Sequence, residues 1–162
     1  MRLITVTVIA VLAAASTALA GGSHLITQST IGKGKLGQSW SAYATAYGKP
    51  KSFDNLEGGL TRLNYPGPIA VYVKTGTNVG RYIVVSGASF KTAKGVGPCS
   101  KAATVKSAYP SAPKISLAGH EYAYRVGTTL WFEIEANKVA AVALGANKQA
   151  AWIASNTPAC GL

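Results

Sequence analysis

The chain has 162 residues, in which 16 lysines and arginines stand against 5 acidic residues, and its formal net charge is +11. This length fits one domain and is too short for two independent ones. The charge favours anionic partners, but no block of about five basic residues is present, which excludes the basic arm typical of many nucleic-acid-binding chains.

The N-terminus has the pattern of a secretory signal peptide. Arg2 precedes an apolar run from Leu3 to Ala15, and Ala18-Leu19-Ala20 fits the small-x-small cleavage rule. The apolar run is shorter than the ~20 residues that a membrane helix needs. We therefore expect an exported protein whose signal peptide is 1–20 and whose mature chain, 21–162, forms one domain without a transmembrane segment.

The two cysteines, Cys99 and Cys160, are expected to form a disulfide in an exported protein. The bridge would close a loop of about 60 residues, for which the chain-entropy model gives roughly 4 kcal/mol. A pair of free thiols remains the alternative.

The first half of the mature chain predicts a helix followed by strands. Residues 24–27 could add an edge strand before a glycine-rich joint. Ser39 can then cap a helix over 40–47, which Gly48 and Pro50 end. Period-2 patterns follow a polar link over 51–59, and they predict strands at Leu60–Tyr65, Ile69–Lys74 and Gly80–Gly87.

The second half repeats this order. Ser100 can cap a helix that ends before Pro110, and a short C-terminal helix is expected over 147–155. Strands are predicted at Lys114–Val126, Thr129–Ala136 and Lys138–Leu144.

These elements predict an α+β fold of two tandem repeats, about 31–90 and about 91–146, followed by the C-terminal helix and tail, 147–162. Each repeat is a short helix followed by an antiparallel three-stranded meander, and helices cover one face of the sheet.

Strand alternation predicts which side chains face these helices. The apolar set expected to face them is Leu63, Tyr65, Val71, Val73, Tyr122, Tyr124, Leu130, Phe132 and Ile134. The alternate residues then lie on the open face, where two large aromatics surrounded by charges are typical of an interaction surface. The candidate partner-binding residues are Tyr72, Trp131, Arg62, Lys74, Arg125 and Glu133. The alternative is that the C-terminal helix or the lead-in strand covers one of the aromatics.

Two glycine-containing phrases, one before each helix, carry a family resemblance: Lys33-Gly34-Lys35-Leu36-Gly37-Gln38-Ser39 and Thr92-Ala93-Lys94-Gly95-Val96-Gly97. With Tyr47-Gly48-Lys49-Pro50 closing the first helix, the chain resembles the beta-lactamase inhibitor proteins and the related small lipoprotein of the outer-membrane assembly machinery. The resemblance implies a non-enzymatic, extracytoplasmic protein that binds other proteins through an aromatic-rich concave sheet. It carries over no individual contact residue and no target.

Catalytic and cofactor patterns are weak. Gly32, Gly34 and Gly37 match the dinucleotide fingerprint, but export and a short following helix argue against it. Glu133 and Glu135 share a strand face at a spacing that a glycosidase could use, although surface glutamates more often pair with arginines. No Cys/His/Asp cluster has metal spacing. We predict no catalytic residues, no cofactor and no metal.

The sequence thus predicts a secreted, non-enzymatic protein-binding or inhibitory module that acts through the open face of its sheet on another extracytoplasmic protein. The alternative is a basic envelope-associated protein held to an anionic cell-wall or surface polymer by its charge. No specific nucleic-acid partner is expected.

Overall fold

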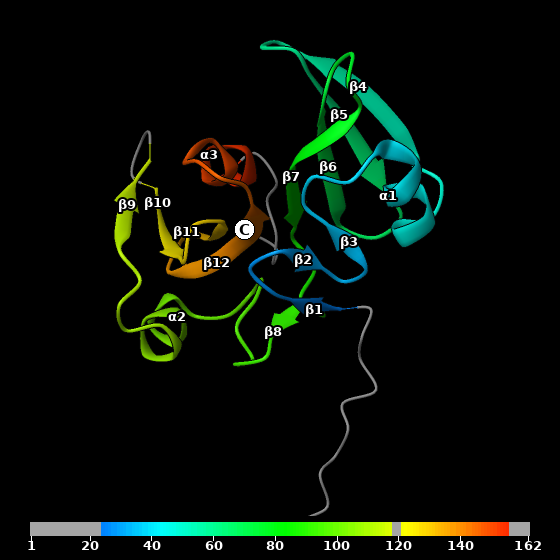
Figure 1. The fold of residues 1–162 in the computed structure, drawn as a ribbon. Helices are drawn as coiled ribbons and strands as arrows, with labels where there is room; N and C mark the ends of the chain where they lie inside the picture. The colour runs from blue at the N-terminus through cyan, green and yellow to red at the C-terminus, as the bar shows by residue number, and fades with distance from the viewer. Residues whose placement is uncertain (1–23, 118–120, 156–162) are drawn as a thin grey trace, which may run out of the picture.

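The computed structural model describes residues 24–117 and 121–155, and strands hold far more of them than helices do (Figure 1). In chain order the elements are β1 Leu25–Ile26, β2 Thr30–Ile31, β3 Gly34–Lys35, α1 Trp40–Tyr47, β4 Ser52–Leu56, β5 Leu60–Tyr65, β6 Ile69–Lys74, β7 Val79–Val85, β8 Lys91–Thr92, α2 Ala102–Ala108, β9 Lys114–Ser116, β10 Tyr122–Val126, β11 Leu130–Glu135, β12 Lys138–Leu144 and α3 Gln149–Ser155.

The main sheet is continuous and has eight strands in the order β4-β5-β6-β7-β12-β11-β10-β9. Every neighbouring pair in it is antiparallel. The two halves of the chain meet at its centre, where Val142 of β12 pairs with Val85 of β7 and Leu144 pairs with Ile83. This order leaves β4 and β9 as the two edge strands.

A small second sheet, in the order β3-β2-β1-β8, supports α1. The Tyr47 hydroxyl donates to the Ile31 carbonyl at 2.5 Å, and the Tyr43 hydroxyl donates to the Lys35 carbonyl at 2.8 Å. Two tyrosines one turn apart therefore fasten the helix to this sheet.

The predicted fold class is wrong. The described residues form a mostly β structure built on one continuous sheet, in place of two α+β repeats that each hold a helix and a three-stranded meander. β4 lies in the segment expected to be a polar link, and the strand expected over 114–126 is divided into β9 and β10. β4 was missed because the side chains on both of its faces are largely exposed, so the strand has no apolar alternation to detect.

The helix starts were predicted with mixed success. Ser39 is the N-cap of α1 and accepts a hydrogen bond from the Ala42 N–H, as expected. Ser100 does not cap α2, whose N-cap is Lys101 without a side-chain cap bond. The Ser100 hydroxyl instead accepts from the Gly97 N–H at 3.2 Å, because it lies in the turn before the helix.

The predicted apolar set does face the first two helices. Most of its members lie in one buried core with Tyr43 of α1 and Val105 of α2, and Tyr122 and Tyr124 pack against this core. Strand alternation therefore assigned this face of the sheet correctly.

The opposite face carries α3, so the expectation that helices cover one face is wrong. Ala150, Ala151, Ile153 and Ala154 form a second core with residues of β6, β7, β11 and β12, and Figure 1 shows α3 and α2 on opposite sides of β12. Alanines also line this face of β12, and such small side chains allow a helix to pack closely against the strand.

Gly80 provides a test of the packing between α1 and the sheet. A β-carbon at this position would overlap the Tyr43 phenol, which is fully buried. We expect Gly80→Ala to lower the free energy of unfolding by about 1–3 kcal/mol, because an added methyl group has no space there. Urea unfolding measures this loss, with exposed Arg81→Ala as a control expected to stay within about 0.5 kcal/mol. Equal stability of the Gly80→Ala variant and the parent would contradict the close approach.

Candidate partner-binding groove

The two aromatics predicted to be exposed are buried. Tyr72 is 3% exposed and Trp131 is 2% exposed, and both belong to the core beneath α3. The Trp131 indole N–H donates to the Gly145 carbonyl at 2.9 Å. The predicted open aromatic surface is therefore wrong, because the C-terminal helix covers it.

The predicted cations of the first half are not gathered at a site. Arg62 is half-buried and forms an ion pair with Asp54 at 2.8 Å, and Asn64 donates to the same carboxylate oxygen at 3.2 Å. Lys74 is exposed at the end of β6. Arg62 thus links β5 to β4 through its ion pair with Asp54.

Of the remaining two predicted residues, Arg125 is half-buried and Glu133 is internal. The Arg125 guanidinium lies 5.6 Å from the Trp131 ring centroid, and its Nε is buried without a hydrogen-bond partner. Glu133 is completely buried, and no side chain in the described part of the chain donates to either carboxylate oxygen. Burial raises the pKa of Glu133 to about 8, and the charges of Glu121 and Glu135 add to this rise.

Of the two cysteines predicted to form a disulfide, Cys99 lies within the described residues. Cys99 is disulfide-bonded, and its backbone N–H donates to the Val139 carbonyl at 2.8 Å. Cys160 lies outside the described residues, as do the signal peptide and His120, so the pairing of Cys99 with Cys160 stays a prediction.

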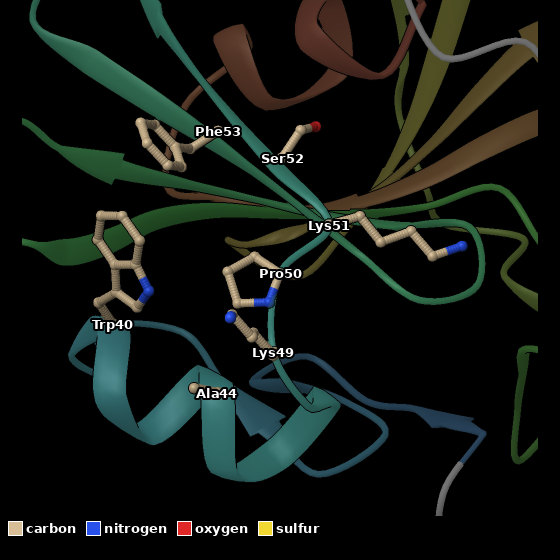
Figure 2. A pocket seen from close by; sticks show the side chains of 7 residues that line it. All are labelled: Trp40, Ala44, Lys49, Pro50, Lys51, Ser52 and Phe53. Atoms are coloured by element: carbon tan, nitrogen blue, oxygen red, sulfur yellow. The ribbon is translucent and has the colours of Figure 1, made fainter.

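A different surface has the features of a binding site. A groove of about 520 Å³ lies between α1 and the start of β4 (Figure 2). Its lining residues are Trp40, Ala44, Lys49, Pro50, Lys51, Ser52 and Phe53. Trp40 points from the first turn of α1 toward Phe53, and the two ring centroids are 6.1 Å apart. Phe53 is 64% exposed, the highest value among the exposed large hydrophobic residues described.

Ring contacts and hydrogen bonds fasten the helix beside this groove. The rings of Tyr43 and Tyr47, on one side of α1, stack with an angle of 9° between their planes. The Tyr47 ring also contacts the Tyr65 ring of β5. Burial raises the pKa of Tyr43 to about 12, so this phenol stays protonated and donates its hydrogen bond across the usual pH range. A helix anchored in this way holds Trp40 in place before any partner arrives.

The groove is basic, and lysines are the ionisable residues of its lining. Lys49 and Lys51 are exposed at its edge, and no carboxylate or imidazole is among the lining residues. Asp54, the acidic residue nearest in sequence, is occupied by Arg62. Within the described part of the chain, no group of three or more metal-ligating side chains comes together. The groove therefore offers aromatic and cationic contacts that suit an apolar and acidic surface.

The sequence contained one signal for this site that was not used. Phe53 stands among polar residues and follows Lys49 and Lys51, and an isolated aromatic in a polar segment is a candidate contact residue. Trp40 has helical spacing with Tyr43 and Tyr47, which is the pattern of an apolar helix face. Only the course of the chain after Pro50 brings these two rings together.

Comparison with known proteins gives the fold alone. No protein-family model matches the chain. No curated protein matches it either. One similar solved structure is an extracellular protein containing an SCP domain from Bacillus anthracis, with a TM-score of 0.51 and 14% identity over 70% of this chain. The matched region spans 45% of that protein. Another is a DUF4309 family protein from Bacillus subtilis, with a TM-score of 0.52 and 13% identity over 77% of this chain and 88% of that one.

No helix in residues 24–117 or 121–155 is long and apolar enough to cross a lipid bilayer.

Proposed function

We propose that this protein is a secreted, non-enzymatic module that binds another extracytoplasmic protein through the groove between α1 and β4. The observation that carries the proposal is Phe53, which β4 presents to solvent beside Trp40 of α1. An aromatic pair with a charged rim is the usual composition of a protein-binding hot spot. The signal-peptide pattern and the resemblance to extracytoplasmic binding proteins support the proposal.

The groove replaces the sheet centre as the contact surface. Tyr72 and Trp131 cannot meet a partner while α3 covers them. A groove of about 520 Å³ has room for a few side chains of a partner. Apolar contact there would remove the exposed part of the Phe53 ring from water, which favours association at roughly 25 cal/mol for each Å² buried.

Affinity capture from secreted and envelope fractions tests the proposal. The immobilised parent should retain a discrete protein, which mass spectrometry identifies and which is then purified. We expect Trp40→Ala/Phe53→Ala to weaken the measured affinity for that protein at least about tenfold. Leu56→Ala is the matched control, because Leu56 is an exposed apolar residue of the same strand on its opposite face.

The charge-driven alternative predicts a different result. Exposed Lys49 and Lys51, together with the net charge of +11, could hold an anionic polymer without any shaped contact. Retention would then fall steeply between about 0.1 M and 0.5 M salt and would be equal for the parent and the aromatic variant. That result would contradict the groove proposal. Near-native urea midpoints for all variants exclude misfolding as the cause.

A further inference from the structure

The outer edge of β4 is open for pairing. β4 is the end strand of the main sheet and pairs with β5 over its whole length, from Ser52 opposite Asn64 to Leu56 opposite Leu60. Within the described residues, no strand pairs with the other side of β4. Such an edge presents a row of backbone N–H and C=O groups to which an extended chain can add.

β4 lacks most of the devices that protect natural sheet edges. Its register with β5 is regular, without a bulge, and it contains no proline or lysine. The opposite edge strand, β9, is better protected. It has only three residues and begins with Lys114, whose ammonium lies 3.8 Å from the Tyr122 ring centroid.

The groove extends beside this open edge. Phe53 belongs to β4 itself and faces α1, since its cross-strand partner Leu63 lies in the core on that side. Lys49 and Lys51 lie just before the strand, while Asp54 is on the opposite face with Arg62. A chain that pairs with β4 would therefore place alternate side chains near two aromatic rings and two exposed cations.

We propose that β4 accepts an extended, acidic segment of a partner protein as an additional strand of the main sheet, with alternate side chains of that segment in the groove. The inference rests on the proposed function and specifies the chemistry of the partner. Backbone pairing gives a general affinity, and the groove selects apolar and acidic side chains. A second copy of this chain fits poorly, because its own net charge of +11 repels it.

A synthetic peptide of about eight residues, slightly longer than a typical strand, provides the probe. Tyrosine, valine and two glutamates occupy its alternate positions, which share one face, and threonines occupy the positions between them. Its fluorescently labelled form is titrated with the mature protein. We expect saturable binding, and no binding when lysine replaces the glutamates. Lys49→Gln/Lys51→Gln should weaken binding about threefold to tenfold, as two exposed ion pairs would. Lys101→Gln/Lys138→Gln changes two exposed lysines near α2 and should leave it unchanged.

Two further readouts separate strand addition from simple contact in the groove. Hydrogen exchange should slow at alternate amides of β4 when the peptide binds, because every second N–H of an edge strand points outward. N-methylation of alternate peptide nitrogens should abolish binding for one of the two possible sets and not for the other. Equal affinities of the two methylated peptides, or unchanged exchange in β4, would overturn the inference. So would dimerisation of the protein through β4 without peptide.

Failure of this inference can be told apart from failure of the proposed function. If the partner is captured with dependence on Trp40 and Phe53 but β4 amides stay unprotected, strand addition is wrong and the groove proposal stands. If the peptide adds to β4 but the captured protein binds Trp40→Ala/Phe53→Ala as tightly as it binds the parent, the groove proposal is wrong.

Discussion

Trp131→Ala is expected to lower the free energy of unfolding by about 3–5 kcal/mol, the largest effect of any substitution considered. The side chain is 2% exposed between β11 and α3, and its removal would leave a cavity against the helix. The loss also leaves the Gly145 carbonyl without its indole donor. Urea unfolding followed by far-ultraviolet circular dichroism measures the change without relying on tryptophan fluorescence.

Trp152→Ala serves as the comparison for this experiment. Trp152 lies in α3 and is 52% exposed, so its removal should cost less than about 1 kcal/mol. Trp131→Phe keeps an aromatic ring but not the N–H donor, and an intermediate loss is expected. A loss below about 1 kcal/mol for Trp131→Ala would show that α3 does not cover this face.

Glu133→Gln is expected to remove a pH dependence of stability. Because the pKa of Glu133 is about 8 in the folded protein and 4.5 is its ordinary value, the folded state binds the proton more tightly than the unfolded state. Stability therefore falls as pH rises from about 4.5 to about 8, by up to about 1.4 kcal/mol for each pH unit, and does not fall further above that range. Burial is the main physical cause of this raised pKa, the charges of Glu121 and Glu135 add to it, and the backbone of Ala141 offsets it in part.

Urea midpoints between about pH 5 and pH 9 test this expectation. The parent should lose stability across the range, whereas Glu133→Gln should be flatter and should exceed the parent most clearly at the alkaline end. Glu57→Gln removes an exposed carboxylate and should keep the parent slope. Parallel curves for the parent and Glu133→Gln would contradict a buried, titrating carboxyl group at this position.

The buried position of Trp131 also shows why the predicted contact surface failed. Alternation along β11 correctly placed Trp131 on the face opposite Phe132. It could not show that α3, which comes later in the chain, covers that face. Loss of binding by a Trp131 variant would therefore report lost stability, which is why Trp40 and Phe53 are the appropriate residues for binding tests.

The sequence by itself determined the local features of this protein. The spacing of Trp40, Tyr43 and Tyr47, with Ser39 before and Gly48 after, was sufficient to bound α1. Period-2 alternation was sufficient for the core strands, because strongly buried strands carry that pattern. These signals depend only on neighbouring residues.

Only the tertiary structure decided how the sheet is continued and covered. Three features depend on residues that are far apart in the chain. They are the pairing of β7 with β12, the edge position of β4, and the packing of α3 over Tyr72 and Trp131. An edge strand with both faces exposed has no hydrophobic period, and a buried face has the same alternation whichever element covers it. The candidate groove arises in the same way, since Trp40 and Phe53 become neighbours only after the chain turns at Pro50 and enters the sheet.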